Sequence, residues 1–325
     1  MPPDLDLALR PEPAFLLLAA LALDAVAGDP LGRAHPVALL GRLVAGLERR
    51  LNRAQRSAAT RQARGVLTVL VVVGTAVAAG LLVRHVALNQ PWGWLLEVAF
   101  VATLLAQKSL AQHVARVRAA LLQGGLAAGR QAVAHIVGRD PETLDHHAVA
   151  RAAIESCAEN FADGVVAPAF WYAVAGPAGI AAYKAINTLD SMIGHRSERY
   201  RDFGRAAARL DDAANLVPAR LAGLLLAAAA VVVPGASPAR AVRAMLRDAG
   251  KHLSPNAGWP EAAVAGALGL ALGGPRSYGG AGGGQAWMGD GRARAMPNDI
   301  RSTLYLYAVA CLLLGGLVAL WLAAG

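Results

Sequence analysis

Residues 304–324 read LYLYAVACLLLGGLVALWLAA and contain no charged side chain. An α-helix of about 20 apolar residues is long enough to cross the roughly 30 Å hydrocarbon core of a bilayer. The stretch therefore predicts a membrane-spanning helix, and it places the chain among integral membrane proteins.

Three more apolar stretches precede it, at residues 65–83, 94–106 and 217–233. The first two flank the turn PWGW (residues 91–94), whose tryptophans are typical of the boundary between membrane and water, so they predict a transmembrane hairpin. The third is short for a span, because Pro218 and Arg220 lie near its start.

Two further stretches are ambiguous. Residues 14–27 are apolar but short, and residues 165–182 are interrupted by Pro168, Gly176, Pro177 and Gly179. Non-helical backbone at membrane depth occurs only where protein or water satisfies it, so we interpret residues 165–182 as a broken or re-entrant helix pair. If every apolar stretch crossed the membrane, some of the polar motifs would lie on opposite sides. A single catalytic site needs these motifs together, so we expect one or two of the weaker stretches not to cross.

The composition also favours a helical membrane protein. Of the 325 residues, 56% are hydrophobic and only 5% are aromatic, which favours helices over a β-barrel. The net charge is +9, but Lys and Arg are dispersed without a nucleic-acid motif, so we predict no nucleic-acid partner. The arginine-rich stretch 42–64 is typical of a cytoplasmic segment. The two cysteines, Cys157 and Cys311, predict no disulfide framework.

The predicted fold is therefore all-α: a polytopic integral membrane helical protein with cytoplasmic amphipathic helices and re-entrant or broken segments. We expect one membrane-embedded domain over residues 1–325, in the cell (inner, cytoplasmic) membrane, with lipid as a partner. Residues 273–291 are rich in glycine and predict a flexible loop, because they lack the Gly-Lys-Ser/Thr ending of a phosphate-binding loop.

The first of several polar blocks carries Glu155, Glu159 and Asp163 at i, i+4 and i+8. On a helix these carboxylates share one face, where they repel one another by about a few tenths of a kcal/mol per pair. A divalent cation would offset that repulsion. The alternative is a solvated helix face, which the apolar residues that follow directly make the weaker interpretation.

The second block places Lys184, Asn187, Asp190 and Ser191 on one helical face. A lysine beside an amide and a carboxylate suits phosphate and Mg²⁺, since Mg²⁺ takes one or two carboxylates plus phosphate oxygens. The alternative is a cluster of helix N-caps, which Thr188 and Ser191 could form.

The residues of the other blocks could have either a catalytic or a structural role. Arg209, Asp211, Asp212, Asn215 and Arg220 could hold phosphate or form a salt-bridge network.

A further polar block, around Asp24, Asp29-Pro30 and His35, alone would be a turn with a structural histidine. Residues 254–261, SPNAGWPE, place Asn256 and Glu261 at a predicted helix start.

Taken together and in this order, the blocks resemble the CobD/CbiB family of cobalamin biosynthesis, the adenosylcobinamide-phosphate synthases. The matching stretches span nearly the whole chain and are Asp24 to Pro30, His35-Pro-Val37 with Gly41, Glu155-Ser-Cys-Ala-Glu-Asn160 with Asp163-Gly164, Tyr183-Lys184 with Asn187-Thr-Leu-Asp-Ser-Met192 and Gly194, Arg199-Tyr200 with Phe203-Gly204, Ala208 to Asp212 with Asn215 and Pro218-Ala-Arg220, and Ser254 to Glu261 with Leu272-Gly-Gly274 and Tyr278-Gly-Gly280.

The resemblance implies an acid–amine ligase in the membrane. Such an enzyme joins (R)-1-aminopropan-2-ol, or its O-phosphate, to a propionate carboxylate of adenosylcobyric acid, giving adenosylcobinamide or its phosphate. ATP as co-substrate and Mg²⁺ are the expected energy source and metal, and the active site is expected to face the cytoplasm.

The predicted site residues can be assigned roles in this ligase reaction. The metal is assigned to Glu155, Glu159, Asp163 and Asp190, with Asn187 completing the site. Phosphate binding is assigned to Lys184, Arg209 and Arg220, and Asn256 and Glu261 would position a substrate. Asp212 or His35 could deprotonate the attacking ammonium, and the carboxylates Glu155, Glu159 and Asp190 are counted among the catalytic residues.

Two other classes compete with this interpretation. A Mg²⁺-dependent membrane phospho-alcohol or prenyl transferase also lines helices with Asp and Asn, but its spaced Asp-rich motifs do not occur here. An ion-coupled transporter uses intramembrane carboxylates and broken helices, but the sequence has no inverted repeat.

Overall fold

The structure is a computed structural model that describes residues 11–28, 35–137, 140–195, 197–278 and 281–324. Close contacts divide the chain into two compact units. The first consists of residues 1–106, 167–214 and 315–325, and the second of residues 107–166 and 215–314.

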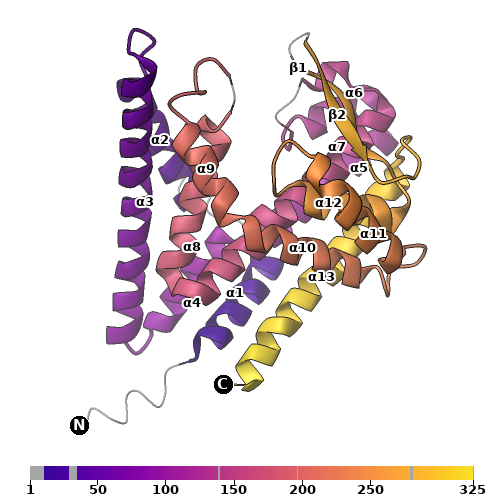
Figure 1. Ribbon diagram of the computed structural model, residues 1–325. Helices are drawn as coiled ribbons and strands as arrows, with labels where there is room; N and C mark the ends of the chain where they lie inside the picture. Colours follow the sequence, from indigo (N-terminus) through magenta and orange to yellow (C-terminus); the bar gives the residue numbers. More distant parts are fainter. Residues whose placement is uncertain (1–10, 29–34, 138–139, 196, 279–280, 325) are drawn as a thin grey trace. The chain divides into compact units, whose positions relative to one another are not determined.

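The described residues of the first unit form six complete helices, seen in Figure 1 with the labels used below, and the last turns of a helix that begins in the second unit. They are α1 (Pro13–Ala27), α2 (Pro36–Leu51), α3 (Ala58–Asn89), α4 (Gly93–Leu104), α8 (Ala167–Ile193) and α9 (Arg205–Ala214). The long helix α3 begins where the Ser57 hydroxyl accepts the backbone N–H of Thr60, which satisfies one of the unbonded donors of its first turn.

Helix α3 packs closely against α8 because glycine lets the two backbones approach. A Cβ on Gly80 would lie 2.5 Å from the Pro177 carbonyl oxygen. Beside this contact α8 is kinked: Ala175 and Gly176 leave the helical region, Gly176 has φ of 60°, and Pro177 follows. A proline inside a helix cannot donate to the preceding turn, which accounts for the break.

A buried polar contact ties α4 to the same pair of helices. Glu97, whose side chain is fully buried, accepts a 2.6 Å hydrogen bond from the Tyr172 hydroxyl on α8. Arg84 on α3 lies 3.4 Å from the other carboxylate oxygen. A buried carboxylate is costly unless it is paired and hydrogen-bonded, as Glu97 is.

The second unit contains the remaining helices and a hairpin (Figure 1). They are α5 (Gln107–Gln123), α6 (Gly125–Val133), η2 (Pro141–Thr143), α7 (His146–Phe161), the π-helical turn η3 (Ala162–Val166), α10 (Leu216–Ala229), α11 (Pro238–Asp248), η4 (Ala249–Lys251), α12 (Gly258–Leu268), β1 (Leu272–Tyr278), β2 (Ala281–Met288) and most of α13 (Pro297–Ala324).

Small residues again set the packing of this unit. Gly266 on α12 lies against the Arg240 carbonyl of α11, where a Cβ would come within 2.3 Å. Gly223 on α10 faces the Met245 sulfur of α11 in the same way. The Tyr307 hydroxyl of α13 donates to the Gln107 carbonyl at 2.8 Å and its ring meets Phe161 edge-on, so these contacts hold α13, α5 and α7 together.

The glycine-rich segment differs from expectation. It is not a loop: β1 and β2 pair antiparallel from Leu272 opposite Met288, with an irregularity between Gly273 and Pro275. Glycine has low strand propensity, so the local composition hid a pairing that is fixed by the ends of the hairpin. Residues 279 and 280 lie outside the described residues.

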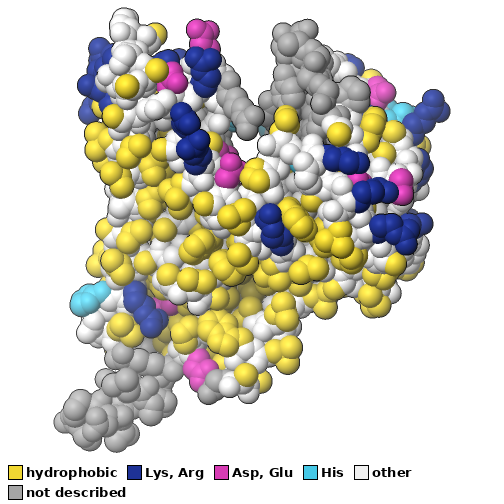
Figure 2. Space-filling model, in the orientation of Figure 1, with side chains coloured by type: hydrophobic (Ala, Val, Ile, Leu, Met, Phe, Trp, Pro, Cys, Tyr) yellow, Lys and Arg dark blue, Asp and Glu magenta, His cyan; other side chains and the backbone are white. Residues whose placement is uncertain are grey.

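The membrane-spanning character is confirmed. Four described helical segments are long and apolar enough to cross a bilayer: Ala58–Asn89, Gly93–Gln123, His146–Ile193 and Pro297–Ala324. The first, second and fourth contain the predicted spans 65–83, 94–106 and 304–324. Figure 2 shows hydrophobic side chains covering the middle of the visible face of α3, with Lys and Arg near its ends.

The weaker stretches behave as their interruptions suggested. The predicted span 217–233 corresponds to α10, which passes the length test only together with α9, across a 48° bend. Residues 165–182 lie inside the third segment and contain the Ala175–Gly176 break, so this helix is broken as expected. Residues 14–27 form α1, an apolar helix shorter than a span.

Candidate active site

Three of the predicted residues share one face of α8. Lys184, Asn187 and Asp190 are all half-buried, while Tyr183 and Leu189, which alternate with them, are fully buried and hold the other side of the helix in the first unit. The spacing that predicted a common face is therefore confirmed.

The alternative explanation for this block, a cluster of N-caps, is wrong. Thr188 and Ser191 lie inside α8, and their hydroxyls donate back to the carbonyls of Lys184 and Asn187 at 2.6 and 2.8 Å. Hydroxyls in this position satisfy themselves within the helix and leave its start unaffected.

The Asp190 carboxylate lies at the end of α8, directly over Gly194. A Cβ on Gly194 would come within 1.9 Å of Asp190 Oδ1 and 2.7 Å of the Asp190 carbonyl oxygen. The same carboxylate interacts electrostatically with Asp212 on α9 and with His195. Two predicted residues from different polar blocks, Asp190 and Asp212, are thus neighbours.

A pocket of about 470 Å³ opens beside these carboxylates. It is lined by Gly194, His195, Tyr200, Arg201, Asp202, Arg205, Ala208, Arg209 and Asp212. The turn that closes it is tight: a Cβ on Gly204 would lie 1.6 Å from the Ile193 carbonyl oxygen, so glycine brings the start of α9 against the end of α8.

The charge of this pocket is mostly positive. Asp202 forms an ion pair with Arg61, which neutralises it. Within the described part of the chain, Arg201, Arg205 and Arg209 make no ion pair. Arginine presents a planar fork of donors that matches phosphate oxygens, so the pocket combines anion-binding groups with the carboxylate of Asp212, which interacts electrostatically with Asp190.

The other predicted residues lie in the second unit, except His35, which belongs to the first. Glu155 on α7 is buried, and its Oε1 accepts the backbone N–H of Gly273 at 2.8 Å. Glu159 is exposed, and Asp163 is half-buried in η3. The straight face that was expected for the three carboxylates is interrupted, because the wider π-helical turn rotates Asp163 relative to α7. Such turns occur often at functional sites.

Two polar contacts surround the start of α12. Arg220 Nη1 donates to Asn256 Oδ1 at 3.3 Å, and its guanidinium carbon lies 4.6 Å from the centre of the Trp259 ring. Glu261 is almost completely buried, with Oε1 3.5 Å from Nε2 of His252. These contacts make the SPNAGWPE segment a rigid corner rather than an open loop.

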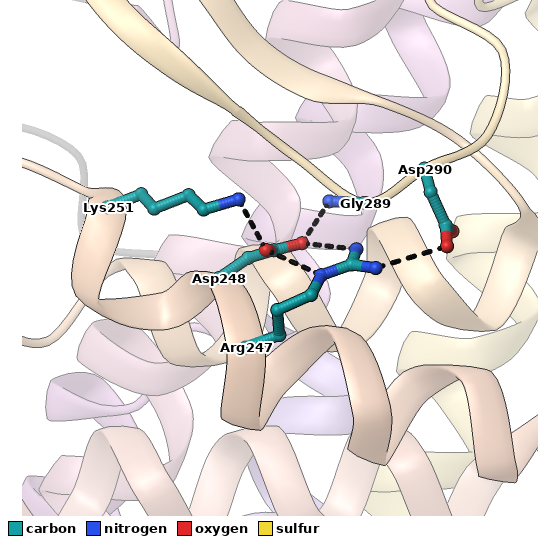
Figure 3. A network of polar contacts seen from close by, with 5 residues as sticks. All are labelled: Arg247, Asp248, Lys251, Gly289 and Asp290. Atoms are coloured by element: carbon teal, nitrogen blue, oxygen red, sulfur yellow. Dashed lines mark hydrogen bonds and ion pairs between the residues drawn. The ribbon is translucent and has the colours of Figure 1, made fainter.

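A further network, drawn in Figure 3, holds the end of the hairpin. The Asp248 carboxylate is fully buried and accepts from Arg247, from Lys251 at 2.7 Å and from the Gly289 backbone N–H at 2.8 Å. Arg247 also lies 3.2 Å from Asp290. The Arg247 guanidinium, followed by Lys251 and the Gly289 N–H, holds the pKa of Asp248 well below its usual range despite burial.

His35 has a structural role. Its Nδ1 accepts the backbone N–H of Val37 at 3.1 Å and so caps α2. Its predicted part in deprotonation stays a prediction, and the neighbouring Asp29-Pro30 lies outside the described residues.

The four predicted metal ligands are divided between the two units. Among the described residues, no three His, Cys, Asp or Glu side chains converge to hold a metal ion. Three of the four predicted ligands, Glu155, Glu159 and Asp163, belong to the second unit, and Asp190 belongs to the first. Mg²⁺ commonly uses one or two carboxylates with phosphate and water. A site centred on Asp190 fits that donor set better than a cage of the four predicted carboxylates, and the full set stays a prediction.

Sequence reasoning gave no role to several residues of the pocket. His195, Arg201 and Arg205 line it, but each lies between the polar blocks rather than within one. The i, i+4, i+8 spacing of Arg201, Arg205 and Arg209 was the available signal. His252, the partner of Glu261, was likewise missed, although it lies two residues before the SPNAGWPE segment.

Comparison with known proteins gives a consistent result. Residues 17–307 match the sequence profile described as CobD/Cbib protein. The chain is 53% identical to "Cobalamin biosynthesis protein CobD" of Sinorhizobium sp over 315 residues, covering 94% of this chain and 98% of the relative. Proteins of the same name from Brucella suis biovar 1 (49% identical, 94% and 95% covered) and Rhodobacter capsulatus (46%, 95% and 98% covered) are also similar. No solved structure matches.

Proposed function

Because the chain belongs to the CobD/Cbib protein family of cobalamin biosynthesis, we propose that it is an acid–amine ligase. It condenses adenosylcobyric acid with (R)-1-aminopropan-2-ol or its O-phosphate, at the expense of ATP. The observation that carries this proposal is the pocket at the end of α8, where Arg201, Arg205 and Arg209 lie beside Asp212, and Asp212 interacts electrostatically with Asp190.

The proposed ligation has two steps, phosphorylation of the acid and attack by the amine. A carboxylate oxygen of the corrinoid attacks the terminal phosphorus of ATP, and ADP leaves as the acyl phosphate forms. The amine nitrogen then attacks the acyl carbon, the C–N bond forms, the C–O bond breaks, and phosphate leaves. The net result is one amide, one ADP and one phosphate for each acid and amine consumed.

The pocket residues have separate tasks in this scheme. Arg201, Arg205 and Arg209 bind phosphate oxygens and stabilise the negative charge that accumulates during transfer. Asp212, which is half-buried beside Asp190, accepts a proton from the ammonium so that the nitrogen lone pair is available. Mg²⁺, when bound with the nucleotide, would be held by Asp190, with Asn187 on the same face of α8, and would neutralise phosphate charge.

The predicted residues of the second unit are held in place by contacts within that unit. Arg220 is fixed by Asn256 and Trp259, and Glu261 by His252, so each presents a preorganised polar group. Glu155, Glu159 and Asp163 remain candidates for a second metal or for an ammonium group. We place the pocket on the cytoplasmic side, because Arg61 of the arginine-rich segment 42–64 forms an ion pair with Asp202, which lines the pocket.

The test is an assay of the purified protein with adenosylcobyric acid, ATP, Mg²⁺ and either amine, followed by mass spectrometry. The expected product has the combined mass of acid and amine less one water, and one ADP appears per amide. A folded preparation that forms no amide with either amine, or forms it without consuming ATP, would contradict the proposal. Transfer of a phospho-alcohol or prenyl group would favour the transferase alternative.

A further inference from the structure

The exposed side of α10 is apolar along its length and continues beyond its end. Val217 and Leu224, two turns apart, are 57% and 53% exposed, and Val231 and Val232 in the following turn are 70% and 65% exposed. Side chains of this type on a helix of a membrane protein face lipid. The chain therefore leaves the apolar region close to residue 232.

A turn then directs the chain into α11. Gly235 has φ of 78°, a backbone conformation that glycine adopts without strain, and Ser237 caps the new helix by accepting the backbone N–H of Arg240. Helix α11 thus begins within a few residues of the lipid-facing end of α10.

The inner face of α11 is fully occupied. Ala241, Ala244 and Met245 are buried, and the helix is held by Gly266 of α12 and Gly223 of α10. The orientation of α11 about its own axis is therefore fixed, and so is the set of side chains on its outer face.

That outer face has two adjacent stripes. One is apolar: Val242 is 38% and Leu246 is 70% exposed, one turn apart. The other is basic and contains Arg240, Arg243 and Arg247, spaced by three and four residues. Figure 2 shows Lys and Arg side chains beside hydrophobic ones over this part of the second unit.

The positive charge of the basic stripe is only partly neutralised by acidic side chains. Arg247 is held by Asp248 and Asp290, whereas Arg240 and Arg243 make no ion pair with the residues that the structure describes. Basic residues beside an exposed apolar ridge are typical of helices that lie in the interface of a membrane, where each Lys or Arg gains from anionic lipid.

We propose that α11 is an interfacial helix, which inserts Val242 and Leu246 at the edge of the bilayer and binds anionic phospholipid headgroups through Arg240 and Arg243. The occupant of this face is the lipid bilayer, because the exposed apolar side of α10 continues into it. The inference is independent of the reaction that the protein catalyses.

The experiment uses full-length protein in nanodiscs of phosphatidylcholine, with or without phosphatidylglycerol. Cys157 and Cys311 are replaced by alanine, and a single cysteine is introduced for an environment-sensitive fluorophore as Leu246→Cys. The matched control is Glu142→Cys, in η2 of the same unit, whose side chain is 75% exposed. Quenching is measured with iodide from water and with brominated lipid chains from the bilayer.

The expected result is that the label at position 246 is quenched by brominated lipid and protected from iodide, while the label at position 142 behaves in the opposite way. In discs that contain phosphatidylglycerol, Arg240→Gln and Arg243→Gln should each lower the ratio of lipid-inserted to water-exposed label at position 246 by about fivefold. This change is measured as stronger quenching by iodide. In phosphatidylcholine alone these substitutions should have little effect.

Three results would contradict the inference. Equal iodide quenching at positions 246 and 142 would leave the outer face of α11 in water. Protection of position 246 from both quenchers would mean that protein, such as a second copy of the chain, covers it. Lipid quenching that does not respond to phosphatidylglycerol or to the arginine substitutions would contradict the anionic headgroup contact.

Discussion

At the scale of single residues, Gly194 controls the position of a predicted catalytic group. Any side chain there would collide with the Asp190 carboxylate and its carbonyl, because the Cβ would lie 1.9 Å from Oδ1. We expect Gly194→Ala to displace Asp190 by close to 1 Å and to lower kcat/KM by about 100-fold, the effect typical of such a misplacement.

The control for this substitution is Gly46→Ala in α2. No atom lies within 4 Å of the added methyl group, so activity should be unchanged. Steady-state amide formation checks both variants, with thermal unfolding to show that each is folded. Full activity of Gly194→Ala would mean that the position of Asp190 does not matter for the reaction.

Asp248 provides a prediction about pH. Arg247, Lys251 and the Gly289 N–H lower its pKa in the folded protein, so its ionised form stabilises the fold. That contribution is fully present above the ordinary carboxylate pKa of about 4 and is lost as the pH falls below it toward the lowered folded value.

Asp248→Asn should therefore unfold more easily at neutral pH, by about 1–3 kcal/mol, because Arg247 and Lys251 lose their shared buried partner. The difference from wild type should shrink as the pH falls below about 4. Thermal unfolding in detergent over a pH series measures it. A difference that is constant with pH would show that the ionised carboxylate is not the stabilising group.

At the scale of secondary-structure elements, the contact of α3 with α8 depends on one glycine. A methyl group on Gly80 would meet the Pro177 carbonyl at 2.5 Å, whereas one on Gly74, on the same helix, would meet nothing within 4 Å. Gly80→Ala should cost about 1–3 kcal/mol through overpacking. Gly74→Ala should be neutral or stabilise by up to about 1 kcal/mol.

The melting temperatures of the two alanine variants in the same detergent decide this prediction. Equal melting temperatures would contradict the close approach of α3 and α8 at the kink.

The elements also show what the sequence could reveal. Hydrophobic length alone located α3 and α13, and the Gly176-Pro177 pair located the break in α8. The hairpin β1–β2 was not predictable, because its pairing joins Leu272 to Met288 through glycines that carry no period-two pattern. The π-helical turn at Asp163 was also hidden, since a one-residue widening leaves the apolar periodicity almost unchanged.

The candidate site was predictable in part, where it depends on spacing along a single helix. Helical spacing correctly placed Lys184, Asn187 and Asp190 on one face. It could not show that the turn after α8 brings Asp212 within electrostatic range of Asp190, because that arrangement depends on the close packing of Gly204 against Ile193. Nor could it distinguish the capping role of His35 from a catalytic one.

At the scale of the whole molecule, the direction in which α3 crosses the membrane fixes the side of the pocket. Arginines at the turn before α3 predict that this end is cytoplasmic. A cysteine introduced as Arg53→Cys should react with a membrane-impermeant maleimide only from the cytoplasmic side of oriented vesicles. Gln90→Cys, at the other end of the helix, should react only from the opposite side.

Labelling of both positions from one side would show that α3 does not cross. Labelling from sides opposite to those expected would place the arginine-rich segment, and the pocket of the same unit, outside the cytoplasm.

The most direct measurement is amide formation by variants of the pocket beside α8 and α9. Purified Asp190→Asn and Arg205→Gln proteins are compared with Arg53→Gln, an exposed arginine of the same unit that does not line the pocket. We predict that the first two lose amide product by about 100-fold or more while remaining folded, since they remove charge at the reacting groups. Arg53→Gln should retain wild-type activity. Wild-type rates in Asp190→Asn and Arg205→Gln would contradict the assignment of the reaction to this pocket.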